Sequence, residues 1–242
     1  KETVDTLTAE NTIINDRISI LRKNIKMYGV KGDGITDDTE QIQSALSDGG
    51  YFYFPDGDYV ITETIHITNS VDIEFSDNAV IHYMRDTQSA FYFSGDFLPP
   101  VALVANADKD SMTIHVSNVN GISSGDWLYI TSDEKASRRA REYDTKREYA
   151  QVESVVGNTI NLRKPLFFSH TVDNNATFEK CNFLTDVKIS GGTLICESEP
   201  PANMPNANRT FGYNFTKCKD FHITGATVKG FDYACIGTYN CL

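Results

Sequence analysis

Residues 28–46 read YGVKGDGITDDTEQIQSAL, and the interpretation of the whole chain depends on this stretch. Its first part contains three glycines within six positions, Gly29, Gly32 and Gly34. Glycine adopts backbone conformations that other residues avoid, so residues 28–36 are predicted to form a tight loop with several turns and no regular element.

A helix is predicted directly after this loop, over residues 37–47. Asp37 is a suitable N-cap, and Glu40 follows three positions later, as in a capping box. Apolar residues then recur at helical spacing, at Ile42, Ala45 and Leu46. Gly49–Gly50 follows, where a left-handed backbone can end a helix.

The sequence after the helix is typical of short strands. Residues 51–67 read YFYFPDGDYVITETIHI, an apolar run followed by a Pro-Asp-Gly turn and an alternating stretch. Alternation continues at Val71, Ile73 and Phe75. We therefore expect residues 51–98 to fold as successive short strands.

The strings GVKGDGITDDT and FPDGDY, on either side of the predicted helix, resemble the N-terminal segment of the pectate-lyase-like right-handed parallel β-helix family. That family includes many phage tail spikes. The chain resembles most the tail spikes, or preneck appendages, of short-tailed phages of Bacillus and other Gram-positive bacteria. The resemblance implies a mainly β fold but not a chemistry, since lyases, hydrolases, epimerases and adhesins share it.

Residues 1–25 carry a heptad pattern that predicts a short parallel coiled coil. Its apolar seam, with one polar member, consists of Val4, Leu7, Asn11, Ile14, Ile18, Leu21 and Ile25. An asparagine in a seam fixes the register of identical chains, which favours a coiled coil over the alternative of a single amphipathic helix lying on the body. The family resemblance implies that the assembly is a homotrimer.

The pattern of apolar and turn residues changes at Pro99–Pro100. Longer strand-like runs, separated by Gly and Asn turns, predict a small antiparallel β-barrel or sandwich over residues 99–171, inserted into the β-helix. We expect residues 101–170 to be replaceable by a short link. The predicted plan is a stalk at 1–25, a capping helix and first coils at 26–98, the insert, and further coils at 172–242.

An internal repeat supports the β-helix independently of the resemblance. Residues 186–194 (DVKISGGTL) recur as residues 220–228 (DFHITGATV), 34 positions later, and FEKC at 178–181 recurs as FTKC at 215–218, 37 positions later. Without the irregular loop 197–210, each coil has about 22 residues, as in other solenoids. The sequence stops within a coil, so we expect this chain to be the N-terminal part of a longer spike.

Composition excludes several other classes of protein. A net charge of -11 argues against nucleic acid as a partner, and no apolar run approaches the length that spans a membrane. The glycine-rich loop lacks the Lys-Ser/Thr of a phosphate-binding loop, and the five histidines show no ligand spacing, so neither a cofactor nor a metal is expected. The cysteines, at 181, 196, 218, 235 and 241, form no CxxC pair and are expected to be free, buried thiols of a chain folded in a bacterial host cytoplasm.

One basic cluster lies within the predicted insert. Its members are Arg138, Arg139, Arg141, Lys146 and Arg147, a candidate contact for an anionic wall polymer such as teichoic acid. The alternative is a solvated segment held by local ion pairs, which neighbouring acidic residues favour because they nearly cancel its charge.

Candidate catalytic residues are carboxylates, because glycan-cleaving β-helices pair an acid with a base or nucleophile. Glu197 and Glu199 on the long loop, and Asp232 beside Tyr233, are the candidates, with ordinary solvated loop acids as the alternative. Tyr213 is a candidate for stacking on a sugar ring, although tyrosine in a β-helix more often belongs to the core.

These observations predict a homotrimeric phage tail spike that joins other virion tail proteins and attaches the virion to host cell-wall glycopolymer. Any glycan-degrading site is expected further along the full chain, so this part is expected to bind weakly or not at all and to cleave nothing. The alternative is a free-standing polysaccharide lyase or glycoside hydrolase. The heptad stalk favours the spike, because secreted enzymes of this kind typically have a signal peptide and act as monomers.

Overall fold

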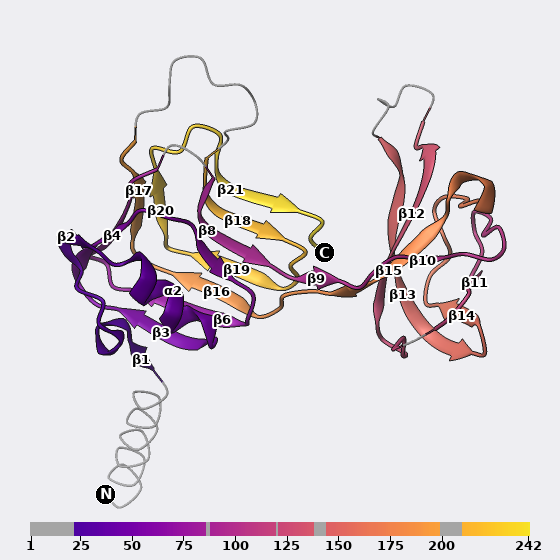
Figure 1. The fold of residues 1–242 in the computed structure, drawn as a ribbon, viewed down its shortest axis with the longest axis horizontal. Coiled ribbons are helices and arrows are strands. Elements are labelled where there is room, and N and C mark those ends of the chain that lie inside the picture. The colour runs from indigo at the N-terminus through magenta and orange to yellow at the C-terminus, as the bar shows by residue number, and fades with distance from the viewer. Residues whose placement is uncertain (1–21, 86–87, 120, 138–143, 199–209) are drawn as a thin grey trace, which may run out of the picture. The chain divides into compact units, whose positions relative to one another are not determined.

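The computed structural model describes residues 22–85, 88–119, 121–137, 144–198 and 210–242, and these divide into two units (Figure 1). Unit 1 consists of the described residues up to Gly95 together with Leu184–Leu242, and unit 2 of Asp96–Phe183. The six seam positions from Val4 to Leu21 lie outside the described residues, so the coiled coil stays a prediction. In the part of the chain that is described, no helix has the length and apolar character needed to cross a membrane.

Unit 1 contains three parallel sheets, and successive turns of the chain add strands to each. Sheet A consists, in spatial order, of β1 (Lys23–Asn24), β3 (Gly50–Phe54), β6 (Val71–Phe75), β16 (Val187–Ser190) and β19 (Phe221–Thr224). Sheet B consists of β2 (Asp33–Asp37), β4 (Gly57–Ile61), β7 (Ala79–Tyr83), β17 (Thr193–Cys196) and β20 (Thr227–Lys229). Sheet C consists of β5 (Ile65–Ile67), β8 (Ser89–Ser94), β18 (Phe211–Thr216) and β21 (Ala234–Tyr239). The expected mainly β fold is confirmed, and these strands stack as the coils of a β-helix.

Alternate residues of each strand point into the coils and form the core of unit 1. In β6 and β7 the burial pattern alternates strictly, as the period of a strand requires. Aromatic rings stack from coil to coil: the Phe215 ring lies 4.7 Å from that of Phe93 and 4.2 Å from that of Phe221, measured between centroids. Each coil therefore buries its apolar face only against its neighbours.

The 34-residue repeat is confirmed by the pairing of strands, whereas the 37-residue repeat is not. Ile189 lies opposite Ile223, and Leu194 lies opposite Val228, both at the 34-residue offset. The second motif fails because Phe178 belongs to β15 (Thr177–Asn182), an antiparallel strand of unit 2, while Phe215 belongs to β18. The position that matches Cys218 in the preceding coil is Leu184.

The helix α2 (Thr39–Ser47) begins two residues later than predicted. Asp37 is not the cap residue, although its Oδ1 accepts a hydrogen bond from the backbone N–H of Thr39 at 3.0 Å. Asp38 occupies the cap position, but its buried carboxylate accepts from the backbone N–H groups of Lys31, at 2.6 Å, and Gly32, at 2.8 Å. The carboxylate therefore accepts hydrogen bonds from backbone N–H groups of the glycine-rich loop, and not from those at the start of the helix.

Helix α2 packs against β5 at the first coil, where it covers the core with Ile42, Ala45 and Leu46. Its Gln43 side chain accepts from the backbone N–H of His66 at 2.7 Å and donates to the carbonyl of the same residue at 2.8 Å. The amide thus satisfies the free edge of β5, as a neighbouring strand would. Gly49 then adopts the expected left-handed conformation, with φ +67°.

The predicted stalk does not extend to residue 25. Ile25 is fully buried in the core of unit 1, at the start of a 3₁₀ helix (Ile25–Tyr28). The two residues before it form β1, which pairs in parallel with β3. Assigning Ile25 to the seam was wrong, because heptad spacing alone does not distinguish an apolar seam residue from an apolar core residue.

Unit 2 contains a seven-stranded antiparallel sheet. Its strands are β9 (Asp96–Phe97), β10 (Val101–Ala102), β11 (Thr113–His115), β12 (Trp127–Lys135), β13 (Thr145–Val156), β14 (Thr159–Leu162) and β15, with a 3₁₀ helix over Val172–Asn174. The boundaries predicted for this segment, 99 and 171, were too narrow. Residues 177–182, which were expected to form a coil, pair with β12 and β9 instead.

A buried histidine holds together the interior of unit 2. His170 is fully buried; its Nδ1 lies 3.1 Å from the Ser132 hydroxyl, and its Nε2 lies 3.0 Å from Oε1 of Glu148. The Glu148 carboxylate also accepts from the backbone N–H groups of Phe167 and Phe168. Burial raises the pKa of Glu148, but these hydrogen bonds outweigh it and leave that pKa below its ordinary value.

Candidate functional site

Of the three predicted catalytic carboxylates, Glu197 lies in a cluster on the outer side of sheet B. It directly follows β17, and its Oε1 lies 2.6 Å from Nδ1 of His82 on β7. Nε2 of the same imidazole lies 3.1 Å from Oδ1 of Asp58 on β4. The structure therefore supplies a carboxylate partner that sequence reasoning had missed.

The register of sheet B explains why these three side chains meet. His82 lies opposite Val60 on one side and Ile195 on the other. Asp58 and Glu197 are each two residues from those positions, so both point to the same face of the sheet as the imidazole. Asp58 lies within the FPDGDY motif, but the register that joins it to His82 depends on stacking of the coils.

The imidazole of His82 is held between two carboxylates. Partial burial lowers the pKa of His82, but hydrogen bonds to Glu197 and Asp58 outweigh that effect and raise it above its ordinary value. Both ring nitrogens are engaged, so the ring acts as a link between coils. The carboxylates border an open hollow of about 530 Å³ and can accept hydrogen bonds from hydroxyl groups there.

The other two predicted catalytic residues do not join this cluster. Glu199 lies outside the described residues. The exposed Asp232 accepts hydrogen bonds from the backbone N–H of Thr210, at 2.9 Å, and from the Thr210 hydroxyl. Burial raises the pKa of Asp232, but these bonds outweigh it and lower that pKa. Asp232 thus holds the turn before β21 to the start of β18, which is a structural role.

The described members of the basic cluster have local partners. Lys146 forms an ion pair with Glu134 at 2.7 Å and donates to the carbonyl of Ser169 at 3.2 Å, and its side chain is only 14% exposed. Arg147 donates to the Thr145 hydroxyl at 3.2 Å. Arg138, Arg139 and Arg141 lie outside the described residues. The geometry of Lys146 favours the alternative of local ion pairing.

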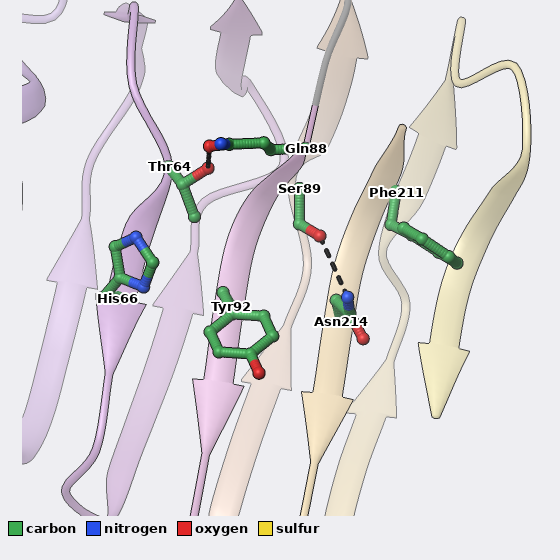
Figure 2. Close-up of a pocket in the computed structure, with 7 residues that line it drawn as sticks. All are labelled: Thr64, His66, Gln88, Ser89, Tyr92, Phe211 and Asn214. Carbon is green, nitrogen blue, oxygen red and sulfur yellow. Dashed lines mark hydrogen bonds between the residues drawn. The ribbon is translucent and has the colours of Figure 1, made fainter. Parts of the chain in front are cut away.

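Tyr213 is unsuited to stack on a sugar ring, because it is only 2% exposed and points into the core. Burial raises its pKa. Polar and aromatic side chains gather instead on the outer side of sheet C, in a hollow of about 340 Å³ that sequence reasoning missed (Figure 2). Its lining residues are Thr64, His66, Gln88, Ser89, Tyr92, Phe211 and Asn214.

Figure 2 shows His66, Tyr92 and Asn214 in a row across three neighbouring strands. The His66 and Tyr92 rings meet edge to face, with centroids 5.6 Å apart. The amide of Asn214 donates to the Ser89 hydroxyl at 3.1 Å. Alternation within β8 and β18 in the sequence indicates which residues point outward. It does not identify which outward residues of neighbouring strands lie side by side.

The cysteines agree only in part with the expectation of buried thiols in the coils. All five are free. Cys196 and Cys218 are buried in unit 1, but Cys181 lies in unit 2 and Cys235 is exposed. Among the described residues, no group of three or more His, Cys, Asp or Glu side chains is arranged to hold a metal ion.

Comparisons with known proteins agree with this fold. Over 71 residues the chain is 32% identical to the pre-neck appendage protein of Bacillus phage B103, an alignment that covers 28% of this chain and 8% of that protein. The tailspike gp49 of Pseudomonas phage LKA1 matches 91% of this chain and 40% of its own, with a TM-score of 0.69 and 19% identity. The gp54 tailspike of Acinetobacter baumannii phage AP22, solved in complex with capsular saccharide, matches 93% and 47%, with a TM-score of 0.62 and 17% identity.

The resemblance to phage tail spikes and appendages is therefore confirmed at the level of similarity. The matched regions make up only 4–20% of the curated relatives' own lengths. The family model for rhamnogalacturonase A/epimerase, pectate lyase-like, matches residues 23–194, which is more than half of the chain. The chain belongs to the rhamnogalacturonase A/epimerase, pectate lyase-like family.

Proposed function

We propose that this chain is part of a phage tail spike or appendage that attaches the virion to a glycopolymer of the host cell wall, either teichoic acid or another polysaccharide. The observation that carries the proposal is the fold match to a phage tailspike over 91% of this chain, spanning both units. The sequence relationship to a Bacillus phage appendage supports a virion location and a Gram-positive host.

The assembly proposed for this spike is a parallel homotrimer that also contacts other virion tail proteins. Its support is the heptad pattern of residues 1–25, shortened now to end before β1. Three identical chains present three copies of each surface, and such multivalency strengthens attachment even where a single site binds weakly.

Glycan degradation by the full-length spike is a further part of the proposal. A carboxylate pair is present at Asp58 and Glu197, but both hold His82, so neither is free of a partner. We therefore still expect no turnover from the 242 residues alone. The family model's description keeps a free-standing polysaccharide lyase or hydrolase as the second candidate.

The test is retention on isolated Bacillus cell walls. Labelled protein would be mixed with intact walls, with walls stripped of teichoic acid, and with walls stripped of all secondary polysaccharide. Display on beads compensates for weak binding by raising the number of linked sites. We expect the weak binding of this part of the spike to give retention on intact walls when the protein is displayed on beads, and a loss of retention when the bound polymer is removed.

Two results would count against the proposal. Retention no greater than that of an unrelated acidic protein, even on beads, would reject attachment as the function of this part. Release of small saccharides from the walls, abolished by Glu197→Gln, would favour the free-standing enzyme. Sedimentation equilibrium tests the assembly separately: a monomer at tens of micromolar would reject the trimer, and Ile18→Asp should dissociate a true coiled coil by placing a charge in each seam.

A further inference from the structure

The hollow on sheet C differs in chemistry from the cluster on sheet B. None of its seven lining residues is a Lys, Arg, Asp or Glu. The hollow offers instead aromatic rings together with amide and hydroxyl groups. Without a permanently charged group, and with the imidazole of His66 as its one ionisable side chain besides the tyrosine, this lining is poorly suited to hold a phosphate or a carboxylate, but it suits a ligand that has apolar faces and many hydroxyl groups.

One polar atom in this hollow lacks a hydrogen-bond partner. Asn214 is only 8% exposed, and its Oδ1 accepts no hydrogen bond from any residue that the structure describes. The other end of the amide is fixed, because its Nδ2 donates to Ser89. A buried acceptor without a donor is costly in free energy, so a ligand that brings a donor gains by satisfying it.

A glycine on the neighbouring strand lets an aromatic ring lie over this amide. Asn214 lies opposite Gly237 on β21, and a Cβ at that position would lie 3.3 Å from the amide oxygen and 2.6 Å from the Phe211 ring. The absence of a side chain at Gly237 thus lets the Phe211 ring lie close to β21. The aromatic surface continues there, because the Phe211 ring packs edge to face on that of Tyr233, 5.1 Å away, and Tyr233 is 49% exposed.

We propose that the hollow on sheet C is a binding subsite for an uncharged saccharide unit, with Tyr92 as its aromatic wall and Asn214 as its central hydrogen-bonding group. The C–H face of a sugar ring packs against Tyr92, as other apolar groups do, while the Phe211 ring, only 6% exposed, borders the amide. A sugar hydroxyl donates to Oδ1 of Asn214, after a small movement of the Phe211 ring. This inference rests on the proposed attachment function and narrows its ligand to the neutral part of the wall polysaccharide.

The experiment titrates the complete chain with two sets of probes. The first set contains neutral oligosaccharides of three to five hexose or N-acetylhexosamine units. The second contains glycerol-phosphate oligomers and uronic-acid oligosaccharides. Binding is followed by saturation-transfer NMR and quantified by titration. At least one neutral probe should bind, and Asn214→Ala and Tyr92→Leu should each weaken it by about tenfold or more.

Tyr53→Leu is the matched control, since it makes the same change on β3 of sheet A and should leave binding unchanged. Melting temperatures establish that each variant is folded. If Asn214→Ala does not fold, Tyr92→Leu and Gly237→Ala carry the test, because a Cβ at position 237 would lie 2.6 Å from the Phe211 ring and displace it from the subsite. Binding of only the charged probes, binding of no neutral probe, or neutral binding that withstands all the folded variants would overturn the subsite.

The wall-retention assay, repeated with these variants, separates this inference from the proposed function. If wild-type protein and the sheet C variants are retained on walls equally well, the proposed attachment function stands and the subsite is rejected. If the variants abolish binding of a neutral saccharide but wild-type protein is not retained on walls, the subsite is supported and the attachment function is rejected.

Discussion

The two units use the same motif in two different ways. Phe178 and Phe215 each begin a Phe-x-Lys-Cys string, yet β15 pairs antiparallel with β12 in unit 2, whereas β18 pairs in parallel with β8 and β21 in unit 1. Both phenylalanines are buried. The local sequence therefore specifies a strand with an inward aromatic residue, while the neighbouring strands decide the direction of pairing.

The histidine–carboxylate contacts of the two units differ in a comparable way. In unit 2, His170 is fully buried and its partner Glu148, whose side chain is only 12% exposed, also accepts from backbone donors. In unit 1, His82 links two carboxylates that are 38% and 59% exposed. A largely buried carboxylate depends on protein donors to replace water, whereas exposed carboxylates can also be solvated, so the two contacts should respond differently to substitution.

The largest expected effect comes from deleting unit 2 outright. Ser94 lies opposite Thr216, and Leu184 lies opposite Cys218, so joining Gly95 directly to Leu184 reproduces the chain path of the next coil. We expect this fusion to be soluble and to lose one complete unfolding transition, measured by calorimetry, while the transition of unit 1 remains.

This fusion should be compared with a second variant, in which a short link replaces only residues 101–170. The sequence alone predicted that this shorter replacement would be tolerated. That replacement leaves β9 and β15 without the strand β12 and exposes the apolar face of β15, so it should aggregate. If the shorter replacement is soluble and the direct fusion is not, unit 2 does not fold as the single segment Asp96–Phe183.

Truncation of the two motif phenylalanines should affect the two units separately. Phe215→Ala removes a ring stacked between two others, and Phe178→Ala removes a buried ring from the core of unit 2, so each should cost its own unit about 3–5 kcal/mol. Amide hydrogen exchange, measured separately for the residues of each unit, shows which unit is destabilised. Phe167→Ala, at a 67% exposed position, should change stability by less than about 0.5 kcal/mol. Equal loss of protection in both units after either buried substitution would show that they unfold together.

Glu148→Gln should destabilise unit 2 by about 1–3 kcal/mol at neutral pH, because an amide cannot accept all the hydrogen bonds that the carboxylate accepts. The pKa of Glu148 is lowered on folding, so its ionised form stabilises the fold above the unfolded-state pKa, and this contribution disappears as pH falls through the folded-state value. Denaturant titrations from pH 7 to pH 3 should therefore show the variant and wild type converging in acid. A difference that stays constant over this range would contradict the assignment.

The smallest effect is expected for His82→Gln in unit 1, less than about 1 kcal/mol, because the carboxylates it links are solvated. The pKa of His82 is raised on folding, so its charged form stabilises the fold fully below the unfolded-state pKa, and this contribution is lost as pH rises through the folded-state value. The difference from wild type should thus shrink as pH rises above the ordinary pKa of a histidine, opposite in sign to the trend for Glu148. A difference that grows with pH would show that His82 is neutral in its folded site.

Much of the fold could be predicted from local patterns. The helix before β3, the alternation in β6 and β7, and the 34-residue repeat are properties of short stretches whose period reflects which side chains face inward. The limits of unit 2 were harder to predict, since the sequences of β9 and β15 have a strand pattern that does not distinguish parallel from antiparallel pairing.

Sequence by itself determined that the chain is mainly β, that it repeats every 34 residues around a loop, and that it resembles the pectate-lyase-like family. Only the tertiary structure decided that Glu197 meets Asp58 across His82, that Ile25 belongs to the core, and that Asn214 lines a hollow with Tyr92. The physical reason is register. A side chain's face depends on its own strand, but its neighbours come from coils that are distant in sequence, and stacking sets which residues share a row.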